Sequence, residues 1–326
     1  MLNTKYYKDI KNFPGQFAAS FKASASLKLK GKYNKFTVCG MGGSSLYVEL
    51  ISDYLRSQGY KDISISHCRS YNLPQYSDNK TLYIVASYSG NTEETISCLE
   101  EIRAKKYKFV ILTSGGKLLE FAKKYKAPVY LVPTGGQPRL ATGYFIAAVL
   151  TIMSKVSTFK LKVKEIENMT KNMEKNLDEK ATKRLAKELI GKVPIIYSTD
   201  INRSIAKISK IKFNENSKIQ SFWNYFPELN HNEMVGFTKL LMQPYFIIYQ
   251  SKFTHPRNIR RIEVFKKLME EKGMDVKVIK MIGKGVLEEI LNAYYFIDHV
   301  TYYLAVEYGV DPEPVEMVEE FKKLLD

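Results

Sequence analysis

The segment 82–95 constrains the fold of this chain more than any other. It begins with an apolar run that predicts a short buried strand, and the run ends at hydroxyl residues and Gly90 before a helical pattern begins at Thr92. Gly90 permits a tight turn, and Thr92 is a suitable N-cap for the helix. Free backbone amides at such a helix start, beside the hydroxyl groups of Ser87, Ser89 and Thr92, suit a phosphate dianion. The simpler interpretation is a helix capped after a polar turn.

A second strand, turn and helix precede this segment. The apolar residues 36–39 lead into Gly40-Met41-Gly42-Gly43-Ser44-Ser45, and an amphipathic helix follows at 46–55. Two closely spaced glycines after a strand also occur in dinucleotide-binding folds. Here, however, Ser45 replaces the third glycine of that fingerprint, and no acidic residue ends a well-placed second strand. The dinucleotide interpretation is therefore disfavoured.

Strand and helix patterns alternate along the remaining chain. We predict further strands at 63–65, 109–113, 129–132, 193–197, 220–225, 245–249 and 276–281. Helices are predicted at 92–105, 117–125 and 140–152, and after residues 203, 256 and 284. This alternation is typical of an α/β protein with parallel sheets covered by helices on both faces. Ligands of such sheets lie beyond the carboxyl ends of the strands, where both glycine-containing turns fall.

The domain organisation is predicted from the same patterns. Residues 1–34 form a helical lead-in, 35–156 a first α/β half, 157–190 a helical connection and 191–326 a second half that ends in helices. The halves resemble a degenerate duplication. Because only the first half has the serine-rich turn, we expect one phosphate site per chain.

Composition limits the classes of function. The 326 residues are 45% hydrophobic and 26% charged, with neither an apolar run of membrane-spanning length nor a signal-peptide core, so we expect a cytoplasmic protein. The net charge is +16, but the lysines are dispersed along helices, which argues against nucleic-acid or membrane binding. A positive field would attract an anionic sugar phosphate.

The three cysteines give no sequence indication of a metal site or disulfide framework. Cys39, Cys68 and Cys98 are widely spaced and lack CxxC or CxxH patterns. No His, Asp and Glu spacing demands a metal either, so we expect neither metal nor cofactor.

Two polar segments of the second half, 213–218 and 226–233, contain candidate catalytic groups. Glu215 and His231 together would supply what an aldose–ketose isomerase requires, one group to open the cyclic sugar and one to move a proton between C1 and C2. Arg139 precedes a strongly apolar helix, where a cation gains nothing from the helix dipole. This position indicates a partner anion, and the alternative is a surface arginine on a loop.

Taken together, these motifs resemble the sugar isomerase (SIS) family, and in particular the archaeal bifunctional phosphoglucose/phosphomannose isomerases. The resemblance covers nearly the whole chain after the lead-in. It rests on Ser87-Tyr88-Ser89-Gly90-Asn91-Thr92, Pro138-Arg139, Asn214-Glu215-Asn216, Glu228-Leu229-Asn230-His231-Asn232-Glu233 and Gly309-Val310-Asp311-Pro312. It implies two SIS-type subdomains, each a flavodoxin-like αβα sandwich.

The resemblance also implies roles for individual residues. The phosphate would be bound by Gly42, Gly43, Ser44, Ser87, Ser89 and Thr92. Glu215 would shuttle the proton, and Arg139 would stabilise the enediolate. His231 would assist ring opening in the active site of the partner subunit of a homodimer.

Two positions near the end of the chain bear on specificity. Thr301 matches the position that the family links to mannose phosphate activity, where a small polar residue lets the open-chain substrate rotate about C2–C3. Tyr308 departs from the family pattern, which has a basic residue there.

The leading functional hypothesis is reversible isomerisation of glucose 6-phosphate and mannose 6-phosphate with fructose 6-phosphate through a cis-enediolate. Two alternatives stay open: another SIS-type sugar-phosphate isomerase, and a sugar-phosphate sensor without catalysis. Sensors of this kind usually carry a helix-turn-helix module, and residues 1–34 show none.

Overall fold

The computed structural model describes residues 4–325. Contacts between residues divide them into an N-terminal unit, Lys11–Asn172, and a C-terminal unit formed by residues 4–10 and 173–325. The division falls inside the segment 157–190. That segment contains α7 (Val163–Lys171), α8 (Met173–Asn176) and α9 (Glu179–Glu188).

The N-terminal unit is built on a five-stranded parallel sheet in the order β2-β1-β3-β4-β5. The strands are β1 (Lys35–Cys39), β2 (Ser64–Cys68), β3 (Thr81–Ser87), β4 (Phe109–Thr113) and β5 (Val129–Leu131). The helices, besides α7, are α2 (Phe13–Ser24), α3 (Tyr47–Ser57), α4 (Glu93–Ala104), α5 (Gly116–Tyr125) and α6 (Thr142–Val156), with 3-10 turns η1 (Gly42–Ser44) and η2 (Pro138–Leu140). Every residue of β3 is buried, as expected for a central strand covered on both faces.

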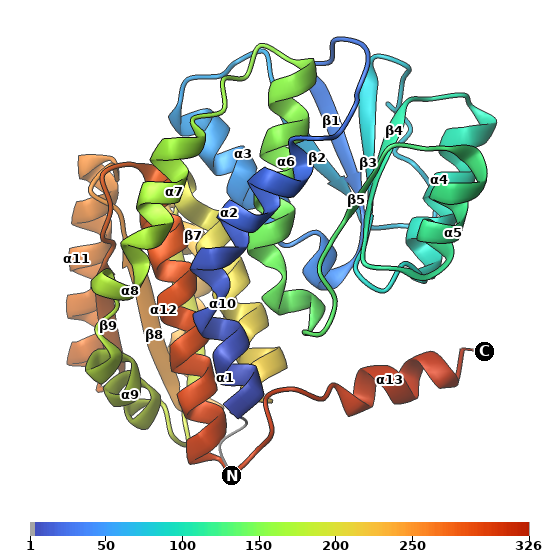
Figure 1. The fold of residues 1–326 in the computed structure, drawn as a ribbon. Coiled ribbons are helices and arrows are strands. Elements are labelled where there is room, and N and C mark those ends of the chain that lie inside the picture. Colours follow the sequence, from blue (N-terminus) through green and yellow to red (C-terminus); the bar gives the residue numbers. More distant parts are fainter. Residues whose placement is uncertain (1–3, 326) are drawn as a thin grey trace. The chain divides into compact units, whose positions relative to one another are not determined.

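Helices cover both faces of this sheet because the chain moves from β1 to β2 in one direction and from β3 to β5 in the other. On one face α4 and α5 pack through a buried cluster that includes Leu99 and Leu118. On the other face lie α3 and α6 (Figure 1), where the rings of Tyr47 and Phe145 stack with centroids 5.4 Å apart. The strand order reverses between β1 and β3, so ligands are expected at the carboxyl ends of these two strands.

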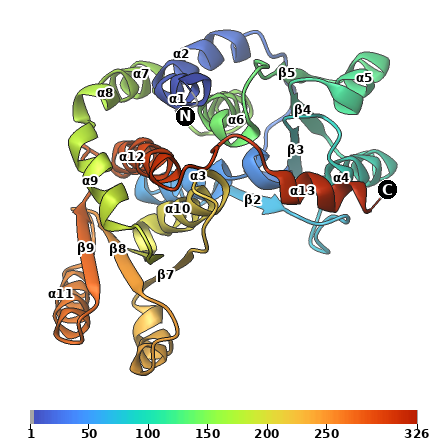
Figure 2. The same ribbon diagram turned by 90° about the horizontal axis from the view of Figure 1, so that it is seen from below.

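The C-terminal unit has a four-stranded parallel sheet in the order β7-β6-β8-β9. Its strands are β6 (Val193–Thr199), β7 (Phe222–Phe226), β8 (Pro244–Gln250) and β9 (Asp275–Lys280). Its other elements, besides α8 and α9, are α1 (Thr4–Lys11), α10 (Arg203–Asn216), α11 (Pro256–Glu271), α12 (Val286–Glu307), α13 (Glu316–Lys323) and the 3-10 turns η3 (Asp200–Asn202), η4 (Glu228–His231) and η5 (Glu233–Thr238). The long helix α12 packs between α9 and α10 (Figure 2), while Phe265 of α11 joins the apolar cluster on the sheet. No helix within residues 4–325 has the length and apolar character that crossing a bilayer requires.

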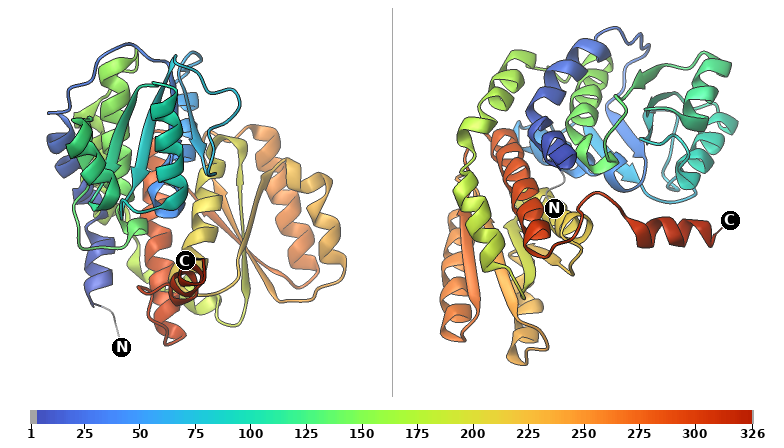
Figure 3. Two further views of the ribbon diagram at one scale, coloured as in Figure 1. Left: turned by 90° about the vertical axis from the view of Figure 1, so that its right-hand side faces the viewer. Right: turned by 60° about the horizontal axis from the view of Figure 1, so that its bottom comes forward.

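The predicted α/β fold with two parallel sheets is confirmed (Figure 3). The second sheet repeats the order of the first four strands of the first sheet, which supports a duplication. Most predicted strands differ from the observed ones by one or two residues at their ends, and the largest difference is at β2. The strand predicted at 63–65 is β2, which extends to Cys68 because its pairing with β1 continues through Ser66 and His67. These two side chains are polar, so the hydrophobic pattern did not indicate that the strand continues. The strand predicted at 220–225 is β7, Phe222–Phe226.

Candidate active site

The serine-rich turn connects β3 to α4 at the point where the strand order reverses. Thr92 occupies the N-cap position, as predicted, but its hydroxyl makes no capping bond to the helix backbone in the described chain. It instead lies 2.7 Å from the Ser87 hydroxyl, which also accepts a 3.0 Å hydrogen bond from the Gly90 amide. Because the Thr92 hydroxyl makes no capping bond, the amide groups in the first turn of α4 can bind an anion. The exposed Ser89 hydroxyl belongs to the same turn.

The turn needs glycine at position 90. Gly90 has φ +76°, and a Cβ atom there would collide with the carbonyl oxygen of Gly115. Such a backbone is strained for any other residue. The compact turn predicted from the sequence is therefore enforced by local geometry.

The glycine-rich turn after β1 is joined to the serine-rich turn by a hydrogen bond. The Tyr88 amide donates to Ser44 Oγ at 2.9 Å, and both residues are at least partly buried. Gly43 lies against η2, because a Cβ atom at this position would be 2.7 Å from the Arg139 amide nitrogen. The exposed Gly42 and the buried Gly43 and Ser44 thus lie between the serine-rich turn and the arginine loop. The structure brings together all the predicted phosphate-binding residues of the N-terminal unit.

Arg139 is buried, with only 2% of its surface exposed. This excludes the interpretation as a surface arginine on a loop. Its Nη1 atom donates to Gln137 Oε1 at 3.4 Å, and the backbone around it packs against the glycine-rich turn. A buried guanidinium is costly unless acceptors compensate its charge, and Gln137 supplies one of them.

In the C-terminal unit, a buried carboxylate lies at the place equivalent to the serine-rich turn. Beyond the carboxyl end of β8, the Ser251 hydroxyl and the Lys252 amide donate to the carboxylate of Glu289, a fully buried residue of α12. Burial raises the pKa of this carboxyl. An internal carboxylate thus accepts hydrogen bonds at the place where the N-terminal unit has its serine-rich turn.

Glu215 lies in the last turn of α10 and is half-buried. It lines a cleft of about 650 Å³ together with Asn214, Lys218, Asp311 and Met317. Lys218 Nζ donates to the Pro312 carbonyl oxygen at 3.3 Å, so the tail after α12 forms the opposite wall. The cleft therefore places the predicted base where a small polar molecule can reach it.

Thr301 is connected to the helix end that carries Glu215. Its Oγ1 donates to the Ile297 carbonyl oxygen at 2.9 Å and accepts from Asn216 Nδ2, also at 2.9 Å. Tyr6 OH completes the chain by donating to Asn216 Oδ1 at 2.6 Å. Thr301 is fully buried and contacts Asn216, the residue next to Glu215.

Sequence analysis did not identify a buried ion pair just before Glu215. Lys212 Nζ lies 2.7 Å from Asp298 Oδ1, with side-chain exposures of 0% and 2%. A signal was available, because Ile205, Ile208 and Lys212 fall on one buried face of α10. A lysine on such a face requires a buried acidic partner.

His231 and Glu215 lie at opposite ends of the strands of the C-terminal sheet. Helix α10 returns from the carboxyl end of β6 to the amino ends of the strands, so Glu215 lies at the amino edge. β7 then crosses the sheet over about 16 Å, and exposed His231 follows its carboxyl end in η4. The structure does not bring Glu215 and His231 together within one chain.

Tyr308 closes α12 and makes structural contacts. Its hydroxyl accepts a 2.9 Å hydrogen bond from the Gly191 amide and donates to the Leu189 carbonyl oxygen at 3.5 Å. These contacts tie the end of α12 to the turn before β6. They account for a tyrosine at a position where the family resemblance implies a basic residue.

The two parallel α/β units and the serine-rich turn are features of a known class, the SIS-type proteins. The bacterial phospho-glucose isomerase C-terminal SIS domain matches residues 178–325. Among solved structures, tagatose-6-phosphate ketose/aldose isomerase from Escherichia coli has a TM-score of 0.71 at 13% identity, covering 95% of this chain and 94% of that chain. The C-terminal domain of glucosamine-fructose-6-phosphate aminotransferase from Francisella tularensis has a TM-score of 0.68 at 12% identity, covering 94% and 96%. These likenesses establish the fold.

Sequence relatives identify the family. A bifunctional phosphoglucose/phosphomannose isomerase of Aquifex aeolicus is 32% identical over 98% of both chains, and one of Caldicellulosiruptor bescii is 33% identical over 98% of both. A D-glucosamine-6-phosphate 4-epimerase of Sulfolobus acidocaldarius is 32% identical over only 61% of this chain and 63% of its own length. The chain belongs to the bifunctional phosphoglucose/phosphomannose isomerase family and is an isomerase, as the sequence motifs predicted.

Proposed function

We propose that this isomerase interconverts glucose 6-phosphate and mannose 6-phosphate with fructose 6-phosphate in the cytoplasm, through a cis-enediolate. The observation that carries the proposal is the full-length similarity to bifunctional isomerases, against partial similarity to the 4-epimerase. The catalytic candidates Glu215, His231 and Arg139 are present as well, which favours catalysis over a sensor.

Each step of the reaction has a candidate group. The serine-rich turn and the turn at Gly42, Gly43 and Ser44 would hold the substrate phosphate with amides and hydroxyls. Glu215 would take the proton from C2 of the open-chain aldose and return it to C1, while the proton of the C2 hydroxyl group moves to O1. The enediolate formed between these two transfers carries negative charge on oxygen, which the Arg139 guanidinium would stabilise.

His231 is proposed to open the sugar ring in the partner subunit of a homodimer. It would donate a proton to the ring oxygen while the C1 hydroxyl loses one. The support is topological, because the length of β7 separates His231 from Glu215 in the same chain. In a two-fold dimer the same surface of each chain faces the other, so each histidine can serve the partner's glutamate.

Thr301 is proposed to affect the mannose reaction as a positioning residue. It contacts Asn216 rather than the cleft, so it would set the orientation of the helix end that carries Glu215. Thr301→Val keeps the shape but removes the acceptor for the buried Asn216 amide. We expect this change to lower the ratio of mannose 6-phosphate to glucose 6-phosphate formed from fructose 6-phosphate. An unchanged ratio would contradict the assignment.

The assignment of the base is tested with Glu215→Gln. Loss of a general base costs about 10²–10⁴-fold in turnover. We expect a loss of this size, with fructose 6-phosphate binding retained in calorimetry. Glu271→Gln, an exposed change on α11, is the matched control and should leave turnover unchanged. A Glu215→Gln enzyme with normal turnover would refute the role.

The partner role of His231 is tested by mixing two inactive variants. Chains carrying Glu215→Gln and chains carrying His231→Ala are unfolded together and refolded. If His231 acts across the dimer, each mixed dimer has one complete site, and activity returns to about a quarter of the wild-type value. If both residues act within one chain, the mixture stays inactive, which would overturn the proposal.

A further inference from the structure

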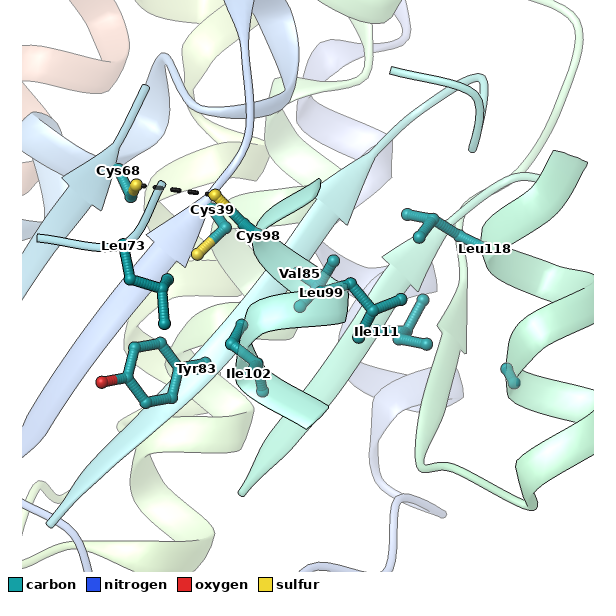
Figure 4. Close-up of a cluster of buried hydrophobic side chains, with 11 residues drawn as sticks. Cys39, Cys68, Leu73, Tyr83, Val85, Cys98, Leu99, Ile102, Ile111 and Leu118 are labelled. Carbon is teal, nitrogen blue, oxygen red and sulfur yellow. Dashed lines mark hydrogen bonds between the residues drawn. The ribbon is translucent and has the colours of Figure 1, made fainter. Parts of the chain in front are cut away.

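The fold gathers the three cysteines that lie far apart in the sequence. Cys39 ends β1, Cys68 ends the neighbouring β2, and Cys98 lies on α4, which packs over these strands. All three side chains are buried, and their sulfur atoms lie within 4.8 Å of one another (Figure 4). The Sγ atoms of Cys68 and Cys98 are 3.7 Å apart. This cluster forms no part of the proposed catalytic machinery.

The cysteines are free thiols, and two of them donate to main-chain carbonyl groups. Cys68 Sγ donates to the Asn72 carbonyl oxygen, and Cys98 Sγ donates to the Ser70 carbonyl oxygen, both at 3.2 Å. The remaining neighbours are apolar residues of the sheet core, such as Leu73 and Leu99. The site is therefore a buried set of three sulfur donors, lined by apolar side chains and two main-chain carbonyl groups.

We propose that Cys39, Cys68 and Cys98 bind one soft, thiophilic metal ion, and that copper(I) is the ion that fits best. Thiolates select soft ions such as copper(I) over hard oxygen-preferring cations. With metal–sulfur bonds of about 2.3 Å, a trigonal plane places its sulfur atoms about 4 Å apart. The observed sulfur separations need to change by less than an ångström to reach this geometry. Each thiol releases its proton to solvent as it binds.

The number of donors favours copper(I) over zinc. Structural zinc sites have four protein ligands, usually in a tetrahedron. Among residues 4–325, the group of side chains able to hold an ion here contains only these three cysteines. A three-coordinate complex satisfies copper(I), whereas zinc would need a fourth ligand in a place that is enclosed by the sheet core.

The site lies directly beneath the phosphate-binding turns. Cys39 precedes Gly40, whose amide donates to the Cys68 carbonyl oxygen at 3.2 Å. Arg69, which follows Cys68 in the sequence, donates from Nε to Ser45 Oγ in the glycine-rich turn at 2.9 Å. A bound ion would therefore join β1, β2 and α4 at the edge where both turns begin. We expect it to raise the thermal midpoint of the protein.

The test is an anaerobic titration of the reduced, full-length protein with copper(I) against a competing chelator. We expect one ion per chain and, in X-ray absorption, three sulfur neighbours of the copper. Cys68→Ser and Cys98→Ser should each lower the affinity at least tenfold. His67→Gln is the matched control, because His67 is next to Cys68 in sequence, and it should leave binding unchanged.

Several results would overturn the assignment. One is an X-ray absorption spectrum in which copper has nitrogen ligands or fewer than three sulfur ligands. The others are copper binding that is unchanged in both serine variants, and the absence of copper binding by the wild-type protein. If a serine variant fails to fold, as judged by circular dichroism, the absorption spectrum of the wild-type complex still decides between three sulfurs and any other ligand set. Zinc bound with four protein ligands would refute the preference for copper(I).

Discussion

The buried ion pair of α10 and α12 gives a quantitative prediction. Lys212 Nζ and Asp298 Oδ1 are 2.7 Å apart, and the two side chains are 0% and 2% exposed. Removing one partner leaves an uncompensated charge in the core, which costs about 3–5 kcal/mol. Lys212→Met should therefore lower the free energy of unfolding by about 4 kcal/mol. At about 2–4 °C per kcal/mol for a unit of this size, the thermal midpoint should fall by about 8–16 °C.

Urea unfolding and calorimetry of four proteins test this value: the wild type, Lys212→Met, Asp298→Leu and the double variant. Replacing both charges by apolar residues is often nearly neutral, so the double variant should recover most of the lost stability. Lys266→Met is the matched control, because Lys266 pairs with Glu270 at 2.9 Å with side chains 43% and 45% exposed, and such pairs contribute about 0.5 kcal/mol. If Lys212→Met costs as little as this control, or the double variant is no better than the single ones, the reasoning is refuted.

Two further predictions concern the N-terminal unit. Gly90→Ala should lower the affinity for fructose 6-phosphate at least tenfold in calorimetry, because the new Cβ atom would collide with the Gly115 carbonyl oxygen and displace the turn. An unchanged affinity would contradict the role of the serine-rich turn in binding phosphate. The Leu73 amide and the Lys105 ammonium donate to Glu101 and hold the pKa of that carboxyl below its usual value. This stabilises the folded state above the usual carboxyl pKa and is lost as pH falls through the lowered one. Glu101→Gln should cost about 1 kcal/mol of unfolding free energy near pH 7 and almost nothing in acid, and an equal cost at both would contradict this.

The sequence predicted the features that depend on local pattern. Apolar runs predicted the strands, and the glycine and hydroxyl residues at 87–92 predicted a turn that the structure confirms. Parallel strands place both turns beyond the carboxyl ends of the strands, as predicted, and the hydrogen bond between Ser44 and Tyr88 joins them there. Local pattern and the rules of parallel sheets are sufficient at these positions.

Features that depend on pairing between distant elements were not predicted. Cysteine spacing gave no indication of the thiol cluster, because it arises from the register that pairs Cys39 with Cys68 and from the packing of α4. Periodicity shows that Lys212 faces the core, but it does not identify Asp298 as the partner. Helical pattern likewise gave no reason to expect that Glu289 would accept a hydrogen bond from Ser251. Each of these needs the three-dimensional arrangement of elements far apart in sequence.

The central claim is tested most directly by a product-resolved assay. Purified protein is incubated with fructose 6-phosphate in the presence of a chelator, and glucose 6-phosphate and mannose 6-phosphate are measured separately. We predict that both products form at rates that Glu215→Gln abolishes. Formation of neither product by folded protein that binds fructose 6-phosphate would contradict the proposed reaction, and glucose 6-phosphate alone would contradict its bifunctional part.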